Sequence, residues 1–446
     1  MKQKARIPRA FAYTILAGCA FLNVEYFMNR LIKIILAMAV AVLSTTILQC
    51  SEPVSYRSHL LEYFIYASPL ILLIRRCRVI VPGIDLPLIL YCLASLVTAR
   101  FIYPESMRWS TTLYGFGFCF MFAMTARLIR IARLSERDYT GFIKLMIYAY
   151  CVVLISQQIS TLFGWPVINH RDIGVPFKLN ALASESSHVG FTVGTFLFFL
   201  NLAQATLHPR EKYSTYFRKN AWVMLAALWC LLTVRASTNF VMLPIAFLPL
   251  LSFRNASAKR FTCIFLGAAA LSATYIFIPG LPRPDSIERI ASFSQGLVTL
   301  DEEKIITGDI SASERIVPMM RIAAMMAPRD PGFWIGHGTD ADVLDLPISP
   351  MDDEPVPYLF HVWYNYGLLA ELALAWLTVS ICLMPRRPWT WFLTVMAVII
   401  LGHNTSSSIW LILTLALQFR MLAEPESRLL DTFQFPKRLS LSLLKS

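Results

Sequence analysis

The sequence predicts an all-α polytopic membrane protein with about twelve transmembrane helices and one large loop outside the cytoplasm. Three observations lead to this fold class. The 446 residues are 56% hydrophobic, with a mean hydropathy of +0.56, which is too apolar for an ordinary water-soluble protein. Apolar runs repeatedly approach or reach the ~20 residues that cross a bilayer as a helix. Basic residues gather in alternate connections between these runs.

The apolar runs form two blocks of predicted membrane helices. The first block, 34–279, contains nine runs: 34–49, 59–74, 79–98, 109–126, 142–164, 187–206, 220–234, 238–253 and 261–279. The second block, 358–420, contains three runs: 358–384, 388–402 and 405–420. Residues 1–33 are then a cytoplasmic N-terminal segment, and residues 421–446 are a cytoplasmic tail.

The orientation follows from the basic residues, because short loops rich in Lys and Arg stay in the cytoplasm. Such loops follow every second run, as at 75–78 and 127–137. Both termini are therefore predicted to be cytoplasmic, and the connection 280–357 to lie outside. A further apolar run, 11–27, is not expected to cross, since crossing would export the basic residues before it. Met28 is a second candidate start.

The loop 280–357 differs in charge from the rest of the chain. It carries 6 Lys and Arg against 14 Asp and Glu, whereas the remainder carries 34 against 14. The basic excess is an orientation signal with some attraction to anionic lipid, so no nucleic-acid partner is predicted. None of the Cys residues lies in the loop, which argues against a disulfide framework there. Function is expected at the outer face of the bilayer or within it.

The loop is expected to contain short helices. Residues 285–295 and 311–326 have helical patterns, and Ser311 with Glu314 has capping-box spacing. Pro318 is expected to bend or delay the second helix. Glycines around 336–338 then predict a turn, followed by an acidic stretch that leads back to the membrane.

Arginines on the outer side are candidate phosphate-binding residues, because a guanidinium group can donate two hydrogen bonds to phosphate oxygens. Arg235 stands at the outer end of a predicted span, and Arg315 and Arg321 lie on the predicted loop helix. Arg171 lies in a second outer connection. An interfacial contact with lipid headgroups for Arg235, and salt bridges to loop carboxylates for the other two, are the alternative interpretations.

Acid–base candidates lie on the same side. Glu185 and His188 are three residues apart where a helix is predicted to enter the membrane, and they share nearly the same face if both lie within that helix. Glu185 is a candidate general base, although an acid near a helix N-terminus is also stabilised by the helix dipole. His337, between two glycines, and His361 are further candidates, with a turn residue and an interfacial residue as alternatives. Asp340-Ala-Asp342 matches a metal-binding D-x-D pattern only formally, and we predict no metal site.

Four segments resemble the O-antigen polymerase and ligase superfamily, the Wzy-type membrane proteins that assemble bacterial surface polysaccharide. Residues 184–188 are similar to a Ser-Glu-Pro-Ser-His pattern, with serine in place of proline. Residues 235–238 resemble a polar turn before a membrane helix, and 313–338 resemble an Arg-bearing helix leading to a Gly-x-Gly turn. Residues 361–372 resemble a His-Asn and Gly-Leu-Leu-Gly sequence, with valine for asparagine and alanine for the last glycine.

The resemblance implies a GT-C-like glycosyltransferase in the bacterial inner membrane, with the large loop in the periplasm. Its substrates would be glycans on undecaprenyl pyrophosphate, and it would join repeat units into O-antigen or exopolysaccharide with inversion. In this interpretation Glu185, His337 and His361 are catalytic, while Arg235, Arg315, Arg321, His188 and Arg171 bind substrate. No cofactor is expected, because the lipid pyrophosphate bond supplies the energy.

Other functions stay open at this stage. An O-antigen ligase would use a lipid A core acceptor, and a flippase or transporter would be expected to show midplane ionisable residues or repeated halves. A noncatalytic partner of an export system would not need the outer Arg and His residues. A chain-length regulator and export machinery are expected partners of a polymerase.

Overall fold

Every described element in a computed structural model of the chain is helical. The structure describes residues 9–45, 59–74, 77–102, 108–132, 134–169, 179–183, 186–234, 237–252, 263, 267, 285–308, 310–345, 360–384, 387–401, 406–425 and 428–430. Among these residues, five helices are long and apolar enough to cross a membrane. The all-helical class is therefore confirmed and fits a multi-pass membrane protein, whereas the total of about twelve spans stays a prediction.

The five long apolar segments are α1 (Arg9–Ser44, with a candidate span at Phe27–Ser44), α3 (Pro82–Val97) with the π-helical turn η3 (Thr98–Ile102), α4 (Trp109–Ala132), α5 (Glu136–Phe163) and α6 (Ser186–Leu207). The other bundle elements are α2 (His59–Ala67), η1 (Ser68–Leu73), α7 (Tyr213–Thr233), α8 (Ser237–Phe247), η4 (Leu248–Ser252), α16 (Leu368–Cys382), α17 (Pro388–Leu401), α18 (Ser407–Ala423) and η5 (Arg428–Leu430). The loop elements are α10 (Asp285–Thr299), α11 (Glu302–Gly308), α12 (Ile310–Met325), α13 (Pro331–Ile335), α14 (Ala341–Asp345) and α15 (His361–Tyr366).

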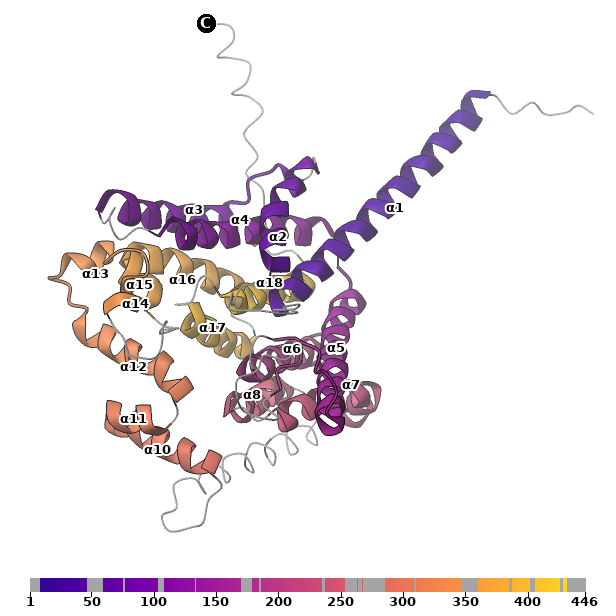
Figure 1. Ribbon diagram of the computed structural model, residues 1–446. Coiled ribbons are helices and arrows are strands. Elements are labelled where there is room, and N and C mark those ends of the chain that lie inside the picture. The colour runs from indigo at the N-terminus through magenta and orange to yellow at the C-terminus, as the bar shows by residue number, and fades with distance from the viewer. Residues whose placement is uncertain are drawn as a thin grey trace, which may run out of the picture.

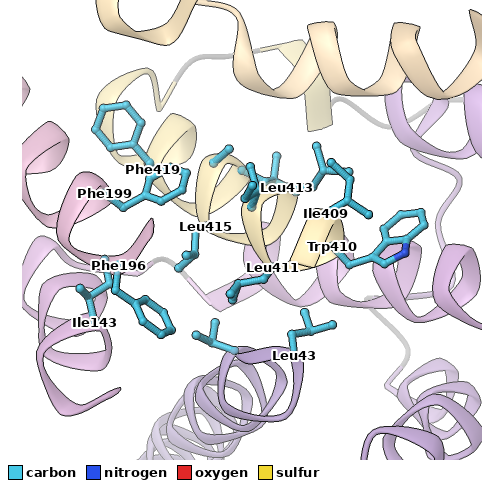
Figure 2. Packing of buried hydrophobic residues seen from close by; sticks show 14 of the residues in the cluster. Leu43, Ile143, Phe196, Phe199, Ile409, Trp410, Leu411, Leu413, Leu415 and Phe419 are labelled. Atoms are coloured by element: carbon cyan, nitrogen blue, oxygen red, sulfur yellow. The ribbon is translucent and has the colours of Figure 1, made fainter. Parts of the chain in front are cut away.

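Helix α18 lies at the centre of the bundle. Its buried residues Ile409 to Phe419 face neighbours on all sides, as expected for a helix that is apolar around its whole circumference. Figure 2 shows Leu43 of α1, Ile143 of α5 and Phe196 of α6 in the core around it. This packing joins helices that are far apart in the sequence into one apolar core.

Helices α6 and α8 approach each other closely through two glycines. A Cβ atom on Gly190 would lie 1.7 Å from the Asn239 side-chain oxygen, and one on Gly194 would lie 2.7 Å from Met242 Cβ. Glycines four residues apart occupy one face of a helix, which is a common arrangement where membrane helices meet. The side-chain amide of Asn239 in turn donates to the Val234 carbonyl and ties α8 to the end of α7.

Polar contacts distinguish two ends of the bundle. At one, called the basic end here, Lys33 pairs with Asp138, Arg127 with Asp85, and Lys219 with Glu211. At the other, called the loop end, α13, α14 and α15 lie together where α3, α4 and α16 meet (Figure 1). The Thr98 hydroxyl of η3 donates to the Ile335 carbonyl of α13 at 2.6 Å and anchors them to the bundle.

The structure refines several predicted boundaries. Helix α1 runs without a break from Arg9 to Ser44, so it contains both the apolar run 11–27 and most of the predicted span 34–49, and α12 begins at Ile310, one residue before the predicted start. Both predicted loop helices are present, and α12 continues through Pro318. The predicted span 358–384 is two helices, because Gly367 adopts φ +83° between α15 and α16. Apart from residues 263 and 267, the predicted span 261–279 lies outside the described residues.

Candidate functional site

Two glycines bring the segment that follows α13 against the start of α16. Gly336 and Gly367 have φ values of +80° and +83°, which side chains rarely adopt. A Cβ on Gly336 would lie 2.3 Å from the Asn365 carbonyl oxygen, and one on Gly367 would lie 2.2 Å from the Trp334 carbonyl oxygen. Only glycine lets these two backbones cross in contact. The His337 amide then donates to the Tyr364 carbonyl at 2.8 Å.

This crossing places a buried polar network at the loop end. Asp342 Oδ2 of α14 lies 2.7 Å from His361 Nδ1 of α15. Asn365 Nδ2 donates to Asp342 Oδ1 at 2.6 Å, and the Asp342 amide donates to Asn365 Oδ1 at 3.2 Å. His361 and Asn365 are one helical turn apart, so both reach the same carboxylate. The network fixes the orientation of the His361 imidazole.

The two ionisable partners shift each other's pKa. Burial alone would raise the pKa of Asp342, but the positive charge and hydrogen bonds of His361 and Asn365 lower it below its usual value. Burial alone would lower the pKa of His361, but the Asp342 carboxylate raises it above its usual value. The structure therefore favours an aspartate paired with an imidazolium.

His337 occupies a more open position beside the same network. Its ring stacks on Tyr364 with centroids 4.2 Å apart, and its Nε2 lies 3.5 Å from Asp330 Oδ2. The Tyr364 hydroxyl donates to Asp345 Oδ2 at 3.0 Å. The His337 side chain is 25% exposed, whereas that of His361 is 9% exposed. Of these two histidines, His337 is the one that a substrate can reach more readily.

Glu371 adds a buried carboxyl group below this network, one turn into α16. Its Oε2 atom has no hydrogen-bond partner among the described residues. It is close enough to His361 for its charge to help raise the pKa of that imidazole. Ionisable residues within apolar helices are costly and commonly functional. Asp342, His361 and Glu371 thus form a buried acidic and basic cluster.

A second polar contact joins the loop to the start of α4. Asp340 accepts a hydrogen bond from Thr111 at 3.0 Å and lies 3.6 Å from Arg108, whose side chain is half-exposed. The hydroxyl groups of Thr112 and Thr339 are 3.3 Å apart. Arg108 therefore places a partly solvated guanidinium group at the edge of the loop end.

The structure brings together only some of the predicted site residues. His337 contacts Tyr364 of α15, the same short helix that carries His361. His188 lies in the first turn of α6, and Arg321 pairs with Glu302 of α11 at 3.0 Å, the salt-bridge alternative considered for it. Arg171, Glu185 and Arg235 lie outside the described residues. The backbone of Arg315 belongs to α12, but its side chain is not among those described.

Sequence reasoning missed several members of the cluster. Asp342 was considered only within the weak D-x-D pattern, and its two oxygens instead contact His361 and Asn365. The four-residue spacing of His361 and Asn365 was a usable signal, because it places both side chains on one helix face. The carboxyl of Glu371 inside an apolar run was another. Arg108 carried no sequence signal beyond its place at a predicted outer helix end.

Comparison with protein-family models, curated proteins and solved structures finds no match for this chain.

Proposed function

We propose that the protein is a membrane glycosyltransferase that polymerises oligosaccharide repeat units carried on undecaprenyl pyrophosphate, at the periplasmic face of the bacterial inner membrane. The observation that carries the proposal is the pair of imidazoles at the loop end. The His337 side chain is partly exposed and lies beside Asp330, and the buried His361 imidazole is hydrogen-bonded to Asp342. The resemblance to Wzy-type polymerases supports the same class of reaction.

The proposed reaction is a direct displacement at the anomeric carbon of the growing chain. A hydroxyl oxygen of the incoming repeat unit forms the new bond to that carbon, and the bond from the carbon to the pyrophosphate oxygen breaks. His337 accepts the hydroxyl proton as general base. The leaving group departs as the lipid pyrophosphate, and the anomeric centre is inverted.

The buried residues have a different role in this proposal. His361 is too enclosed to be the first choice as proton acceptor, so it acts as a positioning residue. With Asp342 it holds the α15 backbone whose Tyr364 carbonyl binds the His337 amide and whose Tyr364 ring supports the His337 imidazole. A preorganised base loses less free energy on reaching the reactive geometry.

Guanidinium groups supply the charge that stabilises the leaving pyrophosphate. Arg108 is the described candidate, since it lies at the edge of the loop end beside Asp340. Arg235, Arg315 and Arg171 keep this role as sequence-based candidates. Arg321 can take part only by exchanging its salt bridge with Glu302 for the phosphate.

The test is a deletion strain complemented with wild type, His337→Gln or a matched control, His208→Gln, and analysed for the size of lipid-linked glycans. His208 is a half-exposed histidine that pairs with Glu136 at the start of α5, away from the loop end. Wild type and control should restore long polymer, and His337→Gln should leave single repeat units while the protein remains in the membrane. Normal polymer lengths with His337→Gln would overturn the assignment of the base. Complete polymer retained on its carrier in the deletion strain would indicate a ligase, and units trapped in the cytoplasm would indicate a flippase.

A further inference from the structure

A groove at the basic end, far from the candidate site, combines exposed apolar side chains with arginines. It has a volume of about 410 Å³, within the usual ~300–1,000 Å³ of ligand pockets. The groove lies between η1, the segment before α3, and α4, and its lining is Leu72, Leu73, Cys77, Arg78, Val79, Ile80 and Arg127. The composition suits a ligand with one charged and one apolar part.

The apolar side of the groove faces outward. Leu73 is 72% exposed and Ile80 is 57% exposed. In a membrane-spanning helical bundle, such exposed aliphatic side chains next to apolar helices contact lipid acyl chains instead of water. The rim of the groove is therefore open to the bilayer.

Arg127 lines the groove, and its guanidinium group is already hydrogen-bonded within the protein. Its terminal nitrogens pair with both carboxylate oxygens of Asp85, at 2.9 and 2.7 Å. Its Nε donates to the Val79 carbonyl at 3.1 Å. Asp85 also accepts a hydrogen bond from the Val81 amide at 2.7 Å, which fixes the segment that forms the groove wall. Arg127 and Asp85 thus supply shape and no net charge.

Two further arginines supply net positive charge. Arg78 is exposed and is anchored at the rim by a hydrogen bond from its Nε to the Leu72 carbonyl at 2.8 Å. Arg130 lies one turn after Arg127 on α4, and its buried NH1 group has no hydrogen-bond partner among the described residues. Arg130 is not among the residues that line the groove, but it lies close enough to Cys77, which does line it, for its charge to act on that thiol. A buried guanidinium nitrogen without an acceptor is costly unless an anion binds it.

We propose that this groove binds an anionic phospholipid of the surrounding bilayer, with Arg78 and Arg130 contacting its phosphate and Leu73 and Ile80 contacting its acyl chains. Basic pockets between membrane helices are suited to anionic headgroups, and the guanidinium fork matches two phosphate oxygens. The site does not depend on the proposed reaction. A phospholipid bound there would contact η1, the segment before α3, and α4 at once, and would stabilise their packing.

The test is native mass spectrometry of the full chain purified in detergent, titrated with phosphatidylglycerol or phosphatidylcholine. Wild type should prefer phosphatidylglycerol. Arg78→Gln with Arg130→Gln should weaken phosphatidylglycerol binding about fivefold for each charge removed and leave phosphatidylcholine binding unchanged. Arg137→Gln is the matched control, because Arg137 is an exposed arginine at the same end of the bundle that neither lines the groove nor, unlike Arg130, lies near enough to act on the lining residue Cys77.

Three outcomes would overturn the proposal. One is equal binding of the two lipids by wild type, and another is an equal loss with Arg137→Gln, which would indicate general surface charge. The third is displacement of phosphatidylglycerol by an equal concentration of glycerol 3-phosphate, which would indicate a site for a soluble anion. If the double variant does not fold, Arg130→Lys serves instead. It keeps the charge and should retain the preference for phosphatidylglycerol, but with weaker binding because the fork is lost.

Discussion

The carboxylate of Asp342 and the imidazole of His361 form a buried ion pair, with Oδ2 and Nδ1 2.7 Å apart. The pair joins α14 to α15, the short helix that precedes α16. Asn365 completes it by donating to the second carboxylate oxygen. The proposed base, His337, is held by backbone and ring contacts to the same helix, so the buried pair and the open histidine form one structural unit.

Replacing Asp342 with Asn should destabilise the loop end strongly. Removal of one partner of a buried pair leaves the other charge uncompensated, at a cost of about 3–5 kcal/mol. We expect a lower midpoint of thermal unfolding in detergent, measured by the fluorescence of the tryptophans. Asp345→Asn is the control, because Asp345 is exposed and accepts a hydrogen bond from the neutral Tyr364 hydroxyl, whereas Asp342 is buried against an imidazole. Equal losses in both variants would contradict a special role for the buried pair.

The same pair predicts a dependence of stability on pH. The pKa of His361 is raised in the folded protein. Its contribution to the free energy of unfolding is therefore fully present below the unfolded-state pKa of ~6.5, and it is lost as pH rises through the folded-state pKa. The pKa of Asp342 is lowered, so its contribution is present above ~3.9 and is lost as pH falls through the folded value. When the thermal unfolding midpoint is measured against pH, that of wild type should decrease as pH rises above neutral. In His361→Gln this alkaline decrease should be smaller. An unchanged alkaline decrease in His361→Gln would assign the titration to another group.

The sequence predicted the helical class and the loop helices well, because hydropathy and capping depend on neighbouring residues. It also made His337 and His361 candidates, because they stand beside glycines or at a helix entrance, and their catalytic roles stay predictions. The partner of His361 could not be predicted, since Asp342 reaches it only through the crossing of two backbones at Gly336 and Gly367. Such a contact depends on tertiary geometry. The span 358–384 was predicted as one helix for the same reason, because hydropathy does not report the positive φ of Gly367.

The buried ion pair of Asp85 and Arg127 should contribute strongly to the stability of the basic end of the bundle. Asp85→Asn leaves a buried guanidinium without its counterion, and a loss of about 3–5 kcal/mol is expected. Replacing both residues, Asp85→Leu with Arg127→Met, should recover much of this loss, because two apolar side chains need no compensation. Unfolding midpoints of the single and double variants form a double-mutant cycle. Additive losses would show that the two residues do not interact.

Gly367 should tolerate substitution much less well than Gly164, although both have positive φ values, +83° and +67°. Gly164 is in the left-handed helical region with ψ +23°, where alanine costs ~1–2 kcal/mol of backbone strain. Gly367 has ψ +171°, a combination that essentially only glycine adopts, where the strain is about 1–3 kcal/mol. At Gly164 nothing lies within 4 Å of the added Cβ, whereas at Gly367 the Trp334 carbonyl oxygen is 2.2 Å away. Gly367→Ala should therefore lower the free energy of unfolding by about 1–3 kcal/mol more than Gly164→Ala does.

The two alanine variants also separate the site from the rest of the fold. Gly367→Ala should push α13 away from α15 and break the hydrogen bond from the His337 amide to the Tyr364 carbonyl. Polymer length should then fall in cells, while Gly164→Ala leaves it unchanged. Equal thermal midpoints and equal polymer lengths for the two variants would show that the backbone crossing at Gly336 and Gly367 does not position the proposed base.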